Sequence, residues 1–206
     1  VDVELANNGD DCVVIFESEH LAKFLGSVQG WFRRRGFSMV AEEPVFSFDE
    51  IEFCQTKPIL LSTGWRMVRN HAAVFKKDPM CLIAIQNDNV YRKWLYAVGE
   101  CGLSLASGVP VQQSFYNLLK RSGTRCSDAM RDHIFKGTSM MTRLDGLEGV
   151  GVVTPQSRVC YYYAFGVTPD EQVAIERAFD DSVIDQWTPE AVSRDAVELE
   201  PGIKIL

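Results

Sequence analysis

The sequence predicts an α+β fold in which an antiparallel β part is followed by a mostly helical part. In the first part of the chain, apolar residues alternate with polar ones or form short runs between turn signals, as strands do. After about residue 70, apolar residues recur at the spacing of one helix face. The 206 residues, of which 46% are hydrophobic and 24% charged, are enough for a sizeable core.

The first predicted element is a β-hairpin over residues 3–16. Val3 and Leu5 alternate with polar residues, residues 7–10 form a turn cluster, and residues 12–16 form an apolar strand. Both arms are apolar enough for us to expect them to be buried.

A helix follows the hairpin. Ser18 is a suitable cap for its start, and Gly36 is expected to end it in a left-handed conformation after the three arginines at 33–35. The apolar residues that share one face of this helix are Leu21, Phe24, Leu25, Val28 and Phe32.

A second β region is predicted after the helix. Residues 45–48 and 51–54 are apolar enough for strands, and Pro58 is expected to end this region. Residues 59–68 are typical of another hairpin, with its turn at residues 62–64.

The remaining predicted elements are helices. Residues 90–98 carry an apolar stripe at helical spacing, as do residues 111–119 after Pro110. Thr-Pro-Asp-Glu at 168–171 is a complete helix start, with a Thr cap, Pro at the first helical position and Glu at the third. Thr-Pro-Glu at 188–190 predicts a shorter helix.

Several classes of protein are excluded by composition. No run of about 18 apolar residues is present, so no segment is expected to span a membrane. The six cysteines are scattered without a Cys-x-x-Cys pair and the three histidines are isolated, which argues against a structural zinc site or a disulfide framework. Cysteine usage therefore indicates free thiols in a reducing compartment.

The net charge of −7 hides a division along the chain. Residues 1–53 and residues 170–206 each carry a net charge of −7, whereas residues 54–136 carry +7. Because local patches set the electrostatic field, the acidic total does not exclude a polyanionic partner. An ordinary solvated surface remains the alternative.

The tripeptide Gly9-Asp10-Asp11 lies between two apolar strands. A carboxylate at such a turn is held by a rigid scaffold and faces solvent, and Mg²⁺ prefers hard oxygen ligands of this kind. Two such ions can clamp the attacking and leaving oxygens of a displacement at phosphorus. The alternative is a plain hairpin turn with solvated aspartates.

Residues 8–13 (Asn-Gly-Asp-Asp-Cys-Val) resemble motif C of a viral RNA-dependent RNA polymerase, in the form found in tombusviruses and their relatives. Four further stretches resemble that family in the same order. They are residues 36–45 (motif D and its exit), residues 51–58 (motif E, the primer grip), residues 94–110 (thumb) and residues 162–170 (thumb).

The resemblance implies a partial polymerase palm followed by a mostly helical thumb. In this interpretation the palm remainder, with the Gly-Asp-Asp hairpin and one packed helix, covers residues 1–63, and the thumb with its acidic C-terminal end covers residues 64–206. The palm motifs would be motif C at 3–16, motif D at 18–45 and motif E at 51–58.

The resemblance also implies roles for individual residues. Asp10 would ligate a catalytic Mg²⁺ pair, with Mn²⁺ as an alternative ion, and Asp11 would contribute more weakly. Asn8 would approach the incoming nucleotide. Cys54 and Gln55 would lie beside the 3′ end of the growing strand, although a small buried hydrophobe is the alternative for Cys54.

Basic residues after the primer grip are candidates for contacts with RNA phosphates. Arg66 and Arg69 are the foremost of these, and each is also consistent with ordinary surface. For Trp94, Phe115 and Tyr116, core packing is favoured over base stacking because they lie in helical stripes.

The family's motif A, motif B and fingers would precede Val1, and no motif D lysine occurs at residues 39–41. Asp10 and Asp11 would then supply half a metal site, so the isolated chain is expected to be inactive. The implied partners are an RNA template and product strand, nucleoside triphosphates and the missing N-terminal polymerase part.

The function implied is metal-dependent nucleotidyl transfer to an RNA 3′-hydroxyl during viral genome replication. The implied location is the host cytoplasm, in complexes attached to membranes through regions outside this chain, with no membrane contact from this segment. Two alternatives stay open: a non-catalytic subunit of a divided polymerase, and a thumb module that only binds RNA.

Overall fold

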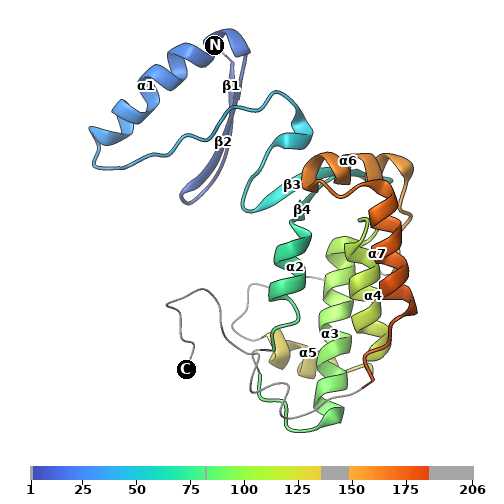
Figure 1. Cartoon of the computed structure of the whole chain (residues 1–206). Coiled ribbons are helices and arrows are strands. Elements are labelled where there is room, and N and C mark those ends of the chain that lie inside the picture. The colour runs from blue at the N-terminus through green and yellow to red at the C-terminus, as the bar shows by residue number, and fades with distance from the viewer. Residues whose placement is uncertain (1, 82, 136–148, 186–206) are drawn as a thin grey trace.

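The computed structural model describes residues 2–81, 83–135 and 149–185 (Figure 1). This part of the chain forms two antiparallel hairpins and seven α-helices, so the predicted α+β class is confirmed. The strands are β1 (Val3–Asn8), β2 (Asp11–Phe16), β3 (Thr56–Leu61) and β4 (Gly64–Arg69). The α-helices are α1 (Leu21–Arg33), α2 (His71–Lys77), α3 (Asp88–Ala106), α4 (Gln112–Ser122), α5 (Asp128–Phe135), α6 (Pro155–Phe165) and α7 (Pro169–Asp181). Two 3₁₀ turns are η1 (Ser18–His20) and η2 (Phe48–Glu50). None of the helices in the described ranges is long and apolar enough to cross a membrane.

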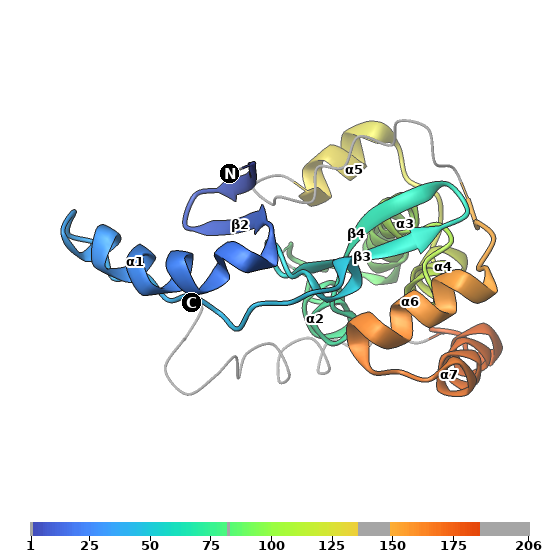
Figure 2. The same ribbon diagram turned by 90° about the horizontal axis from the view of Figure 1, so that it is seen from above.

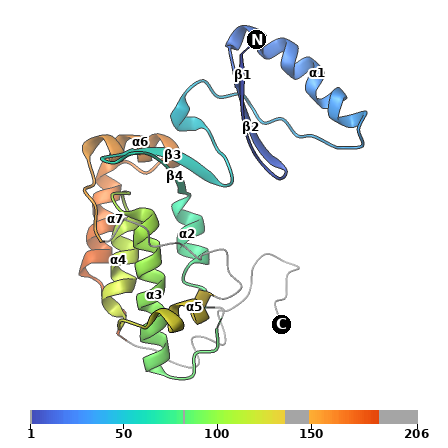
Figure 3. The same ribbon diagram turned by 180° about the vertical axis from the view of Figure 1, so that it is seen from behind.

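The β1–β2 hairpin and α1 project away from a second lobe, which holds β3–β4 and the other helices (Figures 1 and 3). The hairpin runs in register from Val3↔Phe16 to Asn8↔Asp11, as predicted. The expectation that both arms are buried is wrong, because every residue of β1 is exposed and β2 is only half-buried. The two strands pair only with each other, and the described chain leaves β1 uncovered.

Helix α1 matches the predicted range, but its start differs. Ser18 makes no capping hydrogen bond and instead opens the turn η1, which leads into the helix. The predicted end is confirmed: Gly36 has a φ of +84°, and the N–H of Phe37 donates to the carbonyl of Phe32 at 3.1 Å. The aromatic rings of Phe16 and Phe24, 4.9 Å apart, join the hairpin to α1.

The predicted strands at 45–48 and 51–54 are absent from the structure. The side chain of Phe46 is 77% exposed, and only Phe53 forms an isolated bridge, with Thr56. Without an adjacent strand to bind their backbone groups, these residues instead form extended chain and the turn η2.

The β3–β4 hairpin confirms the pairing predicted for residues 59–68. It begins earlier than expected, however, and Pro58 lies inside β3 instead of ending a strand. A proline, which lacks a backbone N–H, is tolerated there because, within the described chain, β3 has a neighbouring strand on one side only. No described strand on the other side is left without a hydrogen-bond donor. This hairpin crosses the predicted palm–thumb boundary at residues 63 and 64.

The core of the second lobe is built on α3 and α4, which lie side by side (Figure 2). Trp94, Phe115 and Tyr116 are buried there, as the sequence predicts. A Cβ atom at Gly102 would lie 1.9 Å from the Tyr116 ring, so only glycine permits this spacing of the helices. Helix α6 covers β3, and α7 packs against α4.

Helices α6 and α7 begin with the same capping device. At α7, Thr168 and Glu171 exchange side-chain and backbone hydrogen bonds after the predicted pattern. At α6, Thr154 and Ser157 do the same, and this helix was not predicted. Helices α2 and α5 were also not predicted. The helix expected at 188–190 lies outside the described residues.

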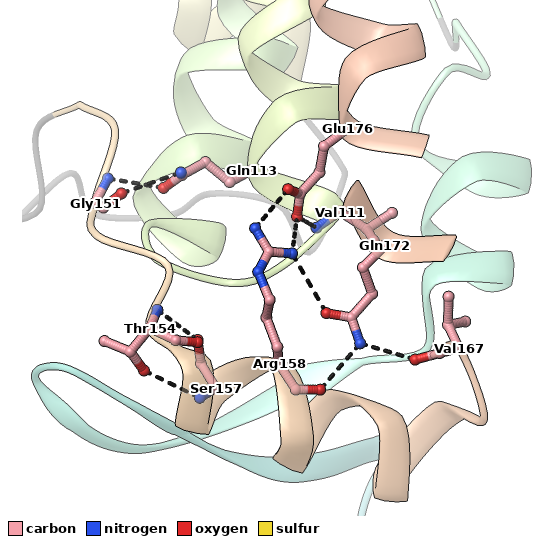
Figure 4. A network of polar contacts seen from close by, with 9 residues as sticks. All are labelled: Val111, Gln113, Gly151, Thr154, Ser157, Arg158, Val167, Gln172 and Glu176. Carbon is pink, nitrogen blue, oxygen red and sulfur yellow. Dashed lines mark hydrogen bonds and ion pairs between the residues drawn. The ribbon is translucent and has the colours of Figure 1, made fainter. Parts of the chain in front are cut away.

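A partly buried polar network joins α6 and α7 to the start of α4 (Figure 4). Arg158 forms a bidentate ion pair with Glu176, with N–O distances of 2.9 and 2.7 Å. The Glu176 carboxylate also accepts the N–H of Val111 at 2.8 Å. Val111 has a φ of +66°, which is strained for a β-branched residue, and this network holds it in place.

His71, the first residue of α2, lies in an aromatic cluster. Its ring centroid is 5.9 Å from that of Phe75, 6.0 Å from Tyr161 and 5.8 Å from Phe165. Its buried Nδ1 has no hydrogen-bond partner among the described residues. Burial therefore lowers the pKa of His71, because the charged imidazolium is poorly solvated there.

This shift predicts a loss of stability in mild acid. Because the unfolded chain binds the proton more readily, the His71 contribution is complete above about pH 6.5 and declines as the pH falls below that value. We expect His71→Phe to remove this part of the pH dependence of the melting temperature, measured by circular dichroism. His133→Gln, at an exposed position, should retain the wild-type pH dependence. An unchanged pH dependence in His71→Phe would contradict the assignment.

Candidate functional site

The tip of the β1–β2 hairpin presents two carboxylates in different settings. Asn8 and Asp11 face each other as the last pair of the ladder, and Gly9 and Asp10 form the turn between them. Gly9 has a φ of +69°, which glycine adopts without strain. Asp10 is consequently exposed at the tip, and Asp11 is half-buried at the start of β2.

A second tight turn lies at Cys54 and Gln55. Phe53 and Thr56 exchange two backbone hydrogen bonds of 3.0 Å, which leaves Cys54 and Gln55 as a two-residue loop. Their φ values are +51° and +59°. For residues other than glycine this left-handed conformation costs roughly 1–2 kcal/mol each, so other contacts must hold the turn.

The hairpin tip supplies such contacts. The backbone N–H of Cys54 donates to Oδ2 of Asp11 at 2.6 Å, across a sequence separation of 43 residues. The side-chain amide of Asn8 donates to Sγ of Cys54 at 3.3 Å. The structure therefore brings together three of the residues singled out from the sequence, Asn8, Asp11 and Cys54, with Asp10 in the turn between the first two.

The carboxylates of Asp10 and Asp11 have the chemistry of a partial Mg²⁺ site. Mg²⁺ takes hard oxygen ligands, commonly one or two carboxylates with water and phosphate oxygens completing the octahedron. The exposed side chain of Asp10 suits such an ion. Across the described ranges, no three His, Cys, Asp or Glu side chains are grouped so that they could hold a metal ion.

The two arginines predicted to contact RNA both have protein partners. Arg69 donates to the carboxylate of the buried Asp78 and, at 3.2 Å, to the hydroxyl of Tyr116. The same hydroxyl donates to Asp78 at 2.5 Å. Arg66 donates to the carbonyl of Leu105 at 3.1 Å. In the part of the chain that the structure describes, no hydrogen bond or ion pair links either arginine or Gln55 to the two aspartates.

The Arg69 site has perturbed acidities. Burial raises the pKa of Tyr116, and the nearby charge of Asp78 raises it further. Burial alone would lower the pKa of Arg69, but the hydrogen bond and the charge of Asp78 outweigh it and raise the value. Tyr116 therefore stays a neutral donor to a charged ion pair.

Comparison with known proteins identifies the family. The family model described as viral RNA-dependent RNA polymerase matches residues 1–186. The chain belongs to this polymerase family. The expected tombusvirus-type relationship is confirmed by the individual relatives.

Three of these relatives are the RNA-directed RNA polymerases of plant viruses. The tobacco necrosis virus (strain A) protein is 40% identical over 181 residues, which cover 87% of this chain and 25% of the relative. The turnip crinkle virus protein is 38% identical over 191 residues, which cover 90% of this chain and 24% of the relative. The tomato bushy stunt virus (strain Cherry) protein is 35% identical over 205 residues, which cover 97% of this chain and 23% of the relative. The chain thus spans about a quarter of the length of these polymerases. No solved structure gives a significant match.

Many basic residues of this polymerase chain stabilise the helical lobe itself. Arg92 donates to the carbonyls of Ser122, Ile184 and Asp185, and Arg121 donates to three carbonyls at the end of α7. Arg131 is paired with Glu100 and Asp128. Several basic side chains of residues 54–136 therefore bind carbonyl and carboxylate groups of the protein itself.

One residue and one contact at the candidate site escaped the sequence analysis. Asp78 forms an ion pair with Arg69. The sequence feature that pointed to it was a single acidic residue in a basic stretch. The contact of Asp11 with the Cys54 N–H had no signal, because neither the positive φ at Cys54 nor the meeting of the two turns is encoded in a local pattern.

A structural role for Arg69 predicts an effect on stability. Arg69→Ala would leave the buried carboxylate of Asp78 without its cation. Breaking a buried pair costs about 3–5 kcal/mol, and the partial exposure of Arg69 reduces this to about 2–3 kcal/mol. Urea unfolding measures the difference. Arg66→Ala, which leaves only a carbonyl without its donor, should cost less than about 1 kcal/mol. Equal losses in the two variants would contradict this assignment.

Proposed function

We propose that the chain forms the end of the palm and the thumb of a viral RNA-directed RNA polymerase. The reaction is metal-dependent nucleotidyl transfer to an RNA 3′-hydroxyl. The observation that carries the proposal is the exposed Asp10 at a hairpin tip whose neighbours, Asn8 and Asp11, contact the Cys54 turn, in a chain of this polymerase family. The palm would cover residues 1–63 and the thumb residues 64–206.

In this proposal Asp10 and Asp11 hold Mg²⁺, with Mn²⁺ as an alternative ion. Asp10 is the principal ligand because its side chain is exposed, and Asp11 contributes less because one of its oxygens accepts the Cys54 N–H. A bound ion would supply positive charge to the phosphate oxygens of the reaction. The protein's own part is to hold two carboxylates at a fixed place beside the substrates.

The partners of the site are an RNA template, its product strand and nucleoside triphosphates. Cys54 and Gln55 lie beside the 3′ end of the growing strand, and Asn8 approaches the nucleotide. Arg66 and Arg69 flank the product strand, where their positive charge attracts phosphates. The side chain of Arg69 is 36% exposed despite its contacts with Asp78, so part of it remains accessible.

The remaining polymerase part completes the palm in this proposal. The exposed arm β1, with Val3 54% and Leu5 66% exposed, offers backbone groups and apolar side chains for that part to cover. The same feature would serve a divided polymerase in which this chain is a separate subunit. An RNA-binding thumb alone is less favoured, since several of its basic residues bind protein groups. Replication would take place in the host cytoplasm, with membrane attachment through other regions.

The central role of Asp10 is tested in the full-length polymerase that carries this segment. Asp10→Ala should reduce primer extension by at least about 100-fold, because a bound metal supplies several kcal/mol of transition-state stabilisation. Glu17→Ala, at an exposed position directly after the same hairpin, should stay within about twofold of wild type. An active Asp10→Ala enzyme would refute the proposed function.

The 206-residue chain by itself is expected to be inactive. Asp10 and Asp11 supply only part of a two-ion site, so each ion lacks ligands. Primer extension with radiolabelled nucleotides should give no product from the isolated chain. If the chain acts as one subunit of a divided polymerase, adding the remaining part as a second polypeptide should restore synthesis. Synthesis by the isolated chain would show that the site is complete without further carboxylates.

A further inference from the structure

We propose that Asp11 acts mainly as a positioning residue, which fixes the Cys54–Gln55 turn relative to Asp10 through the Cys54 N–H. Asn8 provides a second tether to the same turn. This inference rests on the proposed function and deepens it, because it separates the roles of the two adjacent aspartates. Asp10 faces the substrates, and Asp11 faces the protein.

The hydrogen bond from Cys54 to Asp11 has the features of a positioning contact. At 2.6 Å it is short, and its acceptor is a carboxylate, so it belongs to the stronger class of hydrogen bonds. The donor is the first of two residues with positive φ, neither of which is glycine. A turn with such strained central residues keeps its shape when surrounding contacts determine it.

The geometry of the hairpin makes this contact specific to the tip. Asn8 and Asp11 are opposite each other in the ladder, and only Gly9 and Asp10 lie between them. The amide of Asn8 donates to Sγ of the same cysteine at 3.3 Å. The two residues that flank the Gly9–Asp10 turn therefore both hold Cys54. A displacement of the hairpin would carry Asp10 and the Cys54 turn together.

Three variants of the full-length polymerase separate an acceptor from a metal ligand at position 11. Asp11→Asn removes the charge but retains an oxygen that can accept the Cys54 N–H. Asp11→Ala removes both. Cys54→Gly retains the N–H and adopts positive φ without strain, so the turn depends less on an external contact. The measurement is primer extension as a function of Mg²⁺ and nucleotide concentration.

We expect Asp11→Asn to retain activity within about tenfold of wild type, and Asp11→Ala to lose about 100-fold, the effect of a misplaced reacting group. The loss should appear in kcat, with the Mg²⁺ concentration for half-maximal activity within about twofold of wild type, since the principal ligand is intact. The double variant Asp11→Ala/Cys54→Gly should recover at least about tenfold over Asp11→Ala. Cys54→Gly should give no recovery in Asp10→Ala.

A second measurement follows the turn directly. The rate of maleimide labelling at Cys54, resolved from the other cysteines by peptide mass spectrometry, should rise in Asp11→Ala and stay near wild type in Asp11→Asn. Cys12, which is half-buried in the same hairpin, serves as the internal control for general unfolding. A rise at Cys54 without a rise at Cys12 supports the tether.

The outcomes distinguish the two proposals. Equal loss in Asp11→Asn and Asp11→Ala, a raised Mg²⁺ requirement and no recovery with Cys54→Gly would overturn the positioning role and make Asp11 a metal ligand. The proposed function would survive that result, provided that Asp10→Ala is inactive. An active Asp10→Ala enzyme would overturn both.

Discussion

The close contact between Gly102 of α3 and the ring of Tyr116 of α4 sets the position of the Cys54 turn in the helical lobe. Only glycine permits this spacing, since a Cβ would lie 1.9 Å from the ring. The buried hydroxyl of Tyr116 then reaches Asp78, and Asp78 holds Arg69 at the end of β4. Arg69 pairs in register with Thr56, the residue that follows the Cys54–Gln55 turn. A continuous series of contacts thus runs from the helical core to the candidate site.

The Cys54 turn is consequently held from two sides. The β3–β4 hairpin fixes it to the helical lobe, and Asp11 and Asn8 fix it to the tip of the β1–β2 hairpin. Both hydrogen bonds to the hairpin tip, from the N–H of Cys54 to Asp11 and from Asn8 to Sγ of Cys54, involve the same residue, Cys54. The relative position of the two lobes near the site therefore depends on the contacts of Cys54, and the same contacts hold its backbone at positive φ.

Local signals allowed much of the fold to be predicted. The two hairpins, α1 with its glycine end, α3, α4 and the Thr168 capping box follow from short-range patterns and are confirmed. The strands expected at 45–54 fail because alternation of apolar residues specifies a strand only where a neighbouring strand can bind its backbone. Helix α6 had the signal Thr154-Pro155, but Ser157 takes the place of the usual acid. The burial expected for β1 fails for a similar reason: the described residues provide no second layer for it.

The candidate site shows where sequence reasoning ends. The resemblance to the polymerase motifs implies that Asp10, Asp11 and Cys54 belong to one site, but it does not reveal which atom of Asp11 meets which atom of Cys54 across 43 residues. Charge counts have the same limit. The positive net charge of residues 54–136 left an RNA partner open, but Arg92 and Arg121 bind backbone carbonyls and Arg69 binds a buried carboxylate. These contacts hold the guanidinium groups against the protein, so the net charge of a segment does not show which of its basic side chains can reach an RNA phosphate.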